Sequence, residues 1–200
     1  MNKKKLIIGI IIAVSILLVA GIVFLVVDYL NEKELQREKD ALKASYGCHV
    51  VDDAVYAHFA GDCYVFNDKT GEPEALTSVA LDGYQSGESF VGTLELLDYQ
   101  HSESGFLEGT PLVTKMGDFY TILDRKTCRH AETNEDGSNK MVTHFTDYEF
   151  TYYVYPENPE FLAVIIYEHV KDKYHVGIFA NSEERAKEYY QWFRENEPKN

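Results

Sequence analysis

The pattern of apolar and polar residues first separates an N-terminal segment from the rest of the chain. Residues 6–27 form one unbroken apolar run, in which Ser15 is the only polar side chain, between three lysines and Asp28. A helix of this length extends about 33 Å, close to the thickness of a hydrocarbon core, which is roughly 30 Å. The run therefore predicts a transmembrane helix in contact with membrane lipid, preceded by a basic tail at residues 1–5.

A cleaved signal peptide is the main alternative for this run. The apolar region of a signal peptide spans only about 7 to 15 residues. Ala20 and Gly21, the small residues that a cleavage site needs, lie inside the run, and the first cysteine is Cys48. We therefore predict an uncleaved single-pass signal anchor in the cell membrane. Lys and Arg residues flank both ends almost equally, but the short N-terminal tail favours a cytoplasmic N-terminus and an extracytoplasmic C-terminal domain.

Residues 28–45 are rich in charged helix formers and contain neither Gly nor Pro. This composition predicts a helical stalk that continues the apolar helix. Leu35 and Leu42 are one heptad apart and could begin a dimer contact. Two positions are too few to predict a coiled coil, so a solvated spacer is favoured.

Residues 46–200 show the short alternating patterns of strands, separated by Gly, Pro, Asn and Asp. Strict alternation of apolar and polar residues from 147 to 154 and from 174 to 180 predicts half-buried strands. A more apolar strand is expected at 161–170, and a polar loop at 133–140. Further strands are predicted at 54–60, 63–67, 76–81, 90–99, 112–115 and 119–124.

The C-terminal segment has the pattern of an amphipathic helix. Asn181 or Ser182 can cap it, and an apolar stripe follows at Ala186, Tyr189, Tyr190 and Phe193. Strands joined by short turns predict an antiparallel sheet, either closed on itself or curved around this helix. The complete prediction is an α+β chain with a transmembrane helix, a stalk and one β-rich domain with a packed C-terminal helix.

The net charge of the whole chain, −14, restricts the partners that its domain can bind. Nucleic acid is excluded as a partner, because phosphates would be repelled. Binding of a metal ion, a cationic ligand or a basic protein partner is electrostatically more favourable than binding of nucleic acid. The acidity is also explained by solubility alone, which is the simpler account.

Three cysteines allow one disulfide and leave one thiol. Cys48 and Cys63 are the candidates in an extracytoplasmic domain, since they would close a short loop between neighbouring segments. The sequence does not choose among the three possible pairings. Cys63 and Cys128 also fit the role of small buried apolar residues.

Cysteine and histidine lie close together twice, as Cys48 with His49 and as Cys128 with His130. The spacing matches no known zinc pattern, and adjacent residues of a strand point to opposite faces. Asn134, Asp136 and Gly137 are weakly similar to a calcium loop but lack the terminal Glu ligand, so a polar loop is favoured. No metal ligand set, cofactor or catalytic motif is therefore assigned from the sequence.

Three tyrosines, Tyr84, Tyr153 and Tyr155, fall at turns or on the polar side of their strands and are candidates for an interaction surface. Our first hypothesis is a non-catalytic binding or interaction domain with a protein partner. The alternative is a metal-binding protein or small hydrolytic enzyme. It would use the cysteines and histidines at Cys48, His49, Cys128 and His130.

Overall fold

The computed structural model describes residues 3–43, 45–99 and 106–198, and only the backbone of residues 3–16, 43 and 106. The chain divides into two compact units, Met1–Leu42 and Lys43–Asn200. The first contains most of helix α1 (Lys3–Lys43), which is continuous over residues 28–43 of the predicted stalk. The second contains the strands and helix α2 (Glu183–Asn196).

The structure corrects the predicted membrane anchor. Among the side chains that it describes, no helix combines the length and apolar character needed to cross a membrane. In α1 those side chains begin at Leu17, so the apolar run up to Val27 covers about 16 Å, roughly half of a hydrocarbon core. Residues 6–16 of the predicted span lie outside the described side chains. The transmembrane helix, the single-pass signal anchor and the cell-membrane localisation with an extracytoplasmic domain are therefore not supported and are withdrawn, whereas the lipid contact stays a prediction.

The second unit is built from antiparallel strands, and the chain is mainly β with one helix near each end rather than α+β. The strands are β1 (Gly47–Val51), β2 (Ala54–Asn67), β3 (Pro73–Ser86), β4 (Ser89–Leu96), β5 (Phe106–Glu108), β6 (Leu112–Met116), β7 (Phe119–Asp124), β8 (Thr127–Thr133), β9 (Asn139–Phe145), β10 (Tyr148–Val154), β11 (Leu162–Glu168) and β12 (Lys173–Phe179). A short 3₁₀ helix, η1 (Leu97–Tyr99), follows β4.

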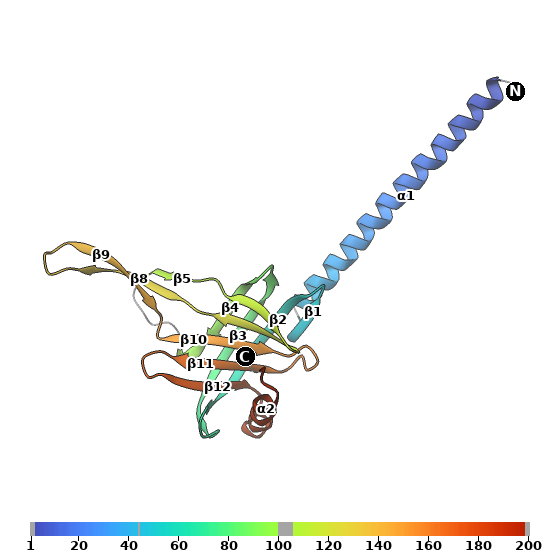
Figure 1. The fold of residues 1–200 in the computed structure, drawn as a ribbon. Coiled ribbons are helices and arrows are strands. Elements are labelled where there is room, and N and C mark those ends of the chain that lie inside the picture. The colour runs from blue at the N-terminus through green and yellow to red at the C-terminus, as the bar shows by residue number, and fades with distance from the viewer. Residues whose placement is uncertain (1–2, 44, 100–105, 199–200) are drawn as a thin grey trace. The chain divides into compact units, whose positions relative to one another are not determined.

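The main sheet closes on itself. From β2 each of its strands pairs with the next along the chain, in the order β3, β4, β6, β7, β10, β11 and β12, and β12 pairs back with β2. The junction of β4 with β6 is the weakest, with the single register pair Ser89 and Leu112. β1 adds to the free part of the β2 edge, and β5, β8 and β9 form a second sheet. Figure 1 shows the β8–β9 hairpin extending beyond the strands of the main sheet.

Two apolar cores follow from this closure, because the strands alternate inward and outward side chains. The inner core lies within the closed sheet and includes Phe59, Leu81 and Tyr152, which are almost completely buried. The outer core lies between the sheet and α2 and includes Phe161 and Phe193. Both cores are filled by large side chains.

Helix α2 forms as its sequence predicts. The Ser182 hydroxyl accepts a hydrogen bond from the Arg185 backbone N–H at 3.2 Å, which satisfies one donor of the first turn. Ala186, Tyr190 and Phe193 are buried on the sheet. Tyr189, the fourth member of the predicted stripe, is only half-buried.

The strand predictions differ from the structure mainly in their boundaries. β7 coincides with its predicted range, whereas β2 joins the two strands predicted at 54–60 and 63–67. The sequence patterns predict neither β1 nor β5. The polar loop expected at 133–140 is a tight turn between two strands, since β8 ends at Thr133 and β9 begins at Asn139. This hairpin is the principal structural element that the sequence patterns do not predict.

Candidate metal centre

The β8–β9 hairpin extends the pair formed by β7 and β10, because both of its strands continue directly from those strands. Buried Thr146 fixes the junction between the two parts. Its backbone N–H and its hydroxyl both donate to the Lys126 carbonyl at 3.1 Å. The base of the hairpin is therefore held by hydrogen bonds close to its first residues.

The far end of the hairpin is a compact turn. The Asn134 N–H donates to the Ser138 carbonyl at 2.7 Å, and Gly137 has the positive φ of 82° that such a turn requires. Asp136 Oδ1 accepts hydrogen bonds from the Ser138 N–H at 2.9 Å and from its hydroxyl at 2.6 Å. The oxygen atoms that resemble those of a calcium loop thus stabilise the turn itself.

The register of β8 and β9 gathers three metal-ligating side chains on one face. Cys128 lies opposite His144, and His130 lies opposite Val142. Directly opposed residues share a face, and so do residues two apart in one strand. Cys128, His130 and His144 therefore point to the same side of the hairpin.

The three side chains approach each other closely enough to hold one ion. Each offers one ligand atom, a Cys sulfur or a His ring nitrogen, and these atoms all lie within 4.8 Å of one another. The two imidazole rings meet edge to face, with centroids 5.2 Å apart. Cys128 is only 1% exposed, His130 is half-buried and His144 is exposed, so the group has a buried and an open side.

A carboxylate lies immediately beside the group. His130 Nε2 is 3.3 Å from Glu132 Oε1, and Lys140 Nζ is 3.5 Å from Glu132 Oε2. A ligating imidazole usually donates its second ring N–H to such a carboxylate, which fixes the ring orientation and raises its basicity. Glu132 is therefore placed to orient the His130 ring through Nε2.

The donor set restricts the kind of ion. One thiolate and two imidazoles suit zinc and copper, whereas calcium and magnesium require oxygen ligands. Three protein ligands leave one position of a tetrahedral zinc ion for water or another ligand. The arrangement thus offers a donor set suited to zinc, with its open side at His144.

The other predicted pair, Cys48 and His49, does not join this group. Both residues lie on β1, with Cys48 opposite Ala57 and His49 opposite Tyr56 on β2. As adjacent strand residues they point to opposite faces, as the sequence indicates. His49 Nε2 instead lies 3.3 Å from the Tyr46 carbonyl oxygen.

The structure also does not bring Cys48 and Cys63 together. Neither forms a disulfide, and Cys63 lies six positions beyond the residue that faces Cys48, a distance of about 20 Å along β2. A disulfide requires Cα atoms within about 7 Å. Burial raises the pKa of each thiol to about 12, so both are protonated at neutral pH and serve as apolar core residues. Their link stays a prediction that the geometry does not favour.

The three tyrosines considered for interaction lie in different surroundings. Tyr153 is buried in the core under α2. Tyr84 stacks on Tyr56 with a centroid distance of 6.2 Å, and the Tyr155 hydroxyl donates to Glu157 at 2.7 Å. They form no common surface, and a role of Tyr84 or Tyr155 in protein binding stays a prediction.

Part of the sequence pattern does indicate that Cys128, His130 and His144 lie close together. Cys128 and His130 are two residues apart, which places both on one face of a strand. The strand that contains His144 can pair with the strand that contains Cys128 and His130 only if residues 134–138 form a hairpin turn. The Asp-Gly pair at 136 and 137 is typical of such a turn. Interpretation of residues 133–140 as a polar loop therefore leaves His144 unconnected with Cys128 and His130.

Comparison with known proteins identifies no relative of this chain: no family model, no curated protein and no solved structure matches it.

Proposed function

We propose that this protein binds one zinc ion through Cys128, His130 and His144 on the β8–β9 hairpin. The observation that supports this function is the convergence of three ligand atoms within 4.8 Å from two paired strands. Glu132 would orient His130, and a fourth coordination position would remain for water or a partner's side chain. The closed sheet serves as the support that holds the hairpin.

Two features favour a metal-binding role for these three residues over a chance clustering of Cys and His side chains. The ligands come from positions fixed by the strand register rather than from flexible loops, so little conformational entropy is lost when the ion binds. The negative charge of the chain, −14, favours the approach of a divalent cation. Acidic charge alone would equally attract calcium and magnesium, whereas a thiolate with two imidazoles favours zinc and copper over those ions.

The test is a zinc titration of the untagged full chain against a chromophoric chelator. We expect one tightly bound zinc ion per chain. Cys128→Ser and His144→Gln should each weaken binding by more than about 100-fold, since loss of a ligand costs more than loss of a residue that only orients one. Zinc should also raise the melting temperature of the wild-type chain and not that of Cys128→Ser.

His49→Gln is the matched control, because it removes an imidazole from β1 while leaving the hairpin intact. Its zinc affinity should equal that of the wild type. Equal affinity of the wild type, Cys128→Ser and His144→Gln would show that zinc binds to surface carboxylates, and the proposal would be wrong.

A further inference from the structure

A second candidate site lies where the edge of β2 changes its partner strand. Along this edge β1 pairs with β2 as far as His58, where it faces Gly47, and β12 begins to pair at Cys63, which faces Phe179. Within the described residues no strand pairs with this edge over 59–62, and residues 60–62 are all exposed. The change of partner leaves a gap along this edge of β2.

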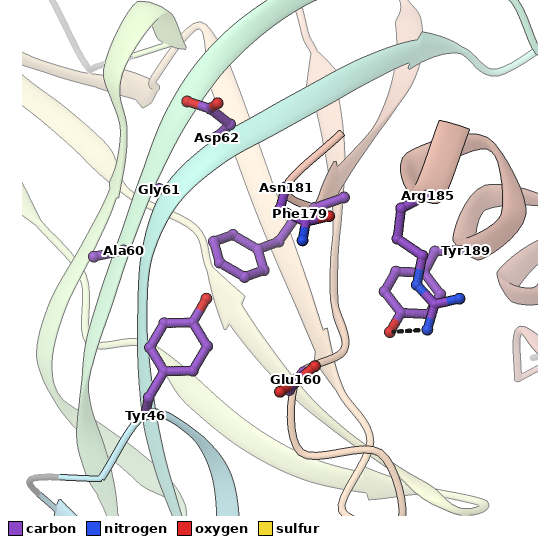
Figure 2. Close-up of a pocket in the computed structure, with 10 residues that line it drawn as sticks. Tyr46, Ala60, Gly61, Asp62, Glu160, Phe179, Asn181, Arg185 and Tyr189 are labelled. Carbon is purple, nitrogen blue, oxygen red and sulfur yellow. Dashed lines mark hydrogen bonds between the residues drawn. The ribbon is translucent and has the colours of Figure 1, made fainter. Parts of the chain in front are cut away.

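Side chains from several elements surround this gap and form a cleft of about 520 Å³. Tyr46 precedes β1, Phe179 ends β12, and Glu160 precedes β11, while Arg185 and Tyr189 belong to α2 (Figure 2). The volume lies within the range of small-molecule sites, roughly 300 to 1,000 Å³. The cleft therefore has room for a small ligand or for one side chain of a partner.

The cleft has aromatic walls. The rings of Tyr46 and Phe179 have centroids 5.8 Å apart, and each also contacts Phe59, which is buried beneath them. Gly61 leaves room for this arrangement, since a Cβ at that position would lie 3.2 Å from the Phe179 ring. Aromatic faces carry partial negative charge and attract cations.

The charges around the cleft also favour a cation. The Arg185 guanidinium is already compensated, because Nη1 lies 2.8 Å from Glu188 Oε2 and Nη2 donates to the Tyr189 hydroxyl at 3.0 Å. The Glu160 carboxylate makes no ion pair within the described residues. Figure 2 shows it between Tyr46 and the Arg185–Tyr189 pair, whereas the Asp62 carboxylate points away from the other side chains. Glu160 is thus the uncompensated charge at the entrance of an aromatic cleft.

We propose that this cleft binds an organic ammonium group, with the cationic head against the Tyr46 and Phe179 rings and paired with the Glu160 carboxylate. Carboxylate and aromatic groups together are the usual means of recognising such ions. The group can belong to a free amine or to a lysine side chain of a peptide. This site is separate from the β8–β9 hairpin and does not depend on zinc.

The test is a titration of the isotope-labelled full chain, followed by NMR chemical-shift changes. The ligands are n-butylammonium, 1-butanol as its neutral counterpart, and a blocked Gly-Lys-Gly peptide. We expect saturable shifts at residues lining the cleft with n-butylammonium or the peptide and not with 1-butanol. The tighter of the two cations identifies the source of the ammonium group.

Substitutions separate this site from general attraction to an acidic protein. Glu160→Gln should weaken binding about tenfold, and Tyr46→Leu about fivefold, whereas Tyr46→Phe keeps the ring and should bind like the wild type. Glu195→Gln is the matched control, since it removes the same charge from an exposed position of α2 outside the cleft. Unsaturable shifts, equal binding of 1-butanol, or equal effects of Glu160→Gln and Glu195→Gln would overturn the proposal.

Discussion

Cys128 and His144 lie directly opposite each other across β8 and β9, although the entire turn of the hairpin separates them in the chain. Strand pairing alone therefore produces this juxtaposition, and His130 joins it because it lies two residues beyond Cys128. A shift of the register by one residue would move one strand's ligands to the other face. The turn that fixes the register is thus part of the proposed metal site.

Glu132 should tune the affinity for zinc without being a ligand. Glu132→Gln removes the carboxylate charge beside His130 Nε2, and zinc affinity should fall by about 10- to 100-fold. Glu135→Gln in the turn changes the net charge equally and should have little effect. A competition titration measures both, and an equal effect of the two substitutions would show that only the overall charge matters.

Thiol chemistry distinguishes the cysteines from one another and tests the disulfide prediction. In denaturant without reductant, three reactive thiols per chain are expected, since the structure contains no disulfide among its cysteines. In the native chain at pH 8, Cys48 and Cys63 should remain unreactive, because burial raises the pKa of each to about 12 and only about one molecule in ten thousand carries the thiolate. A single thiol in denaturant would instead establish a disulfide.

Glu74 should make stability depend on pH. Its pKa is lowered in the folded chain, first by the hydrogen bond from Asn67 Nδ2 at 2.6 Å and then by His175, whose Nδ1 lies 2.7 Å from the second oxygen. The stabilisation is complete above the unfolded pKa, which is about 4.3, and is lost as the pH falls through the lower folded value.

The matching substitution is Glu74→Gln, followed by thermal unfolding at several pH values. It should lower the melting temperature at pH 7, and the difference from the wild type should shrink below about pH 4, where the carboxyl becomes protonated. A difference that stays constant down to pH 2 would show that the charge of Glu74 contributes nothing to stability.

Gly92 should be essential for closing the main sheet. It faces Gly83 across β3 and β4, and a Cβ on Gly92 would lie 2.1 Å from the Asp82 carbonyl oxygen. Because this atom belongs to the backbone, no rotamer relieves the clash, and Gly92→Ala should cost more than about 2 kcal/mol of unfolding free energy.

Gly117→Ala is the comparison for this prediction. Gly117 also has positive φ, 61°, but a Cβ at this position would have no described atom within 4 Å beyond its chain neighbours, so only the backbone conformation is strained. The expected cost is about 1 to 2 kcal/mol. Denaturant unfolding measures both variants, and equal costs would show that the close approach of β3 and β4 is absent.

Sequence patterns predict the parts of the fold that are determined by residues close together in the chain. The cap at Ser182, the buried face of α2 and the strand β7 follow from short-range periodicity and capping. The sequence left a closed sheet and a curved sheet as alternatives, because the choice depends on pairing between β12 and β2 at opposite ends of the domain. The change of partner on β2, and the cleft that it opens, are consequences of that closure.

The candidate sites likewise combine residues that are close in the sequence with residues that only the fold brings together. The spacing of Cys128 and His130 draws attention to both residues, but it matches no known zinc pattern, and His144 lies far from them in the chain. The position of His144 opposite Cys128 depends on a hairpin that the polar composition of residues 133–140 conceals. Glu160 and Tyr46 give no sequence signal, because the two residues meet only in the folded domain.

The most direct test of the proposed function is the zinc-edge X-ray absorption spectrum of the zinc-loaded full chain. We predict one sulfur ligand at about 2.3 Å and two imidazole nitrogens at about 2.0 to 2.1 Å, with the sulfur contribution lost in Cys128→Ser. A spectrum with only oxygen and nitrogen ligands in the wild type, unchanged by Cys128→Ser, would contradict a zinc site at Cys128, His130 and His144.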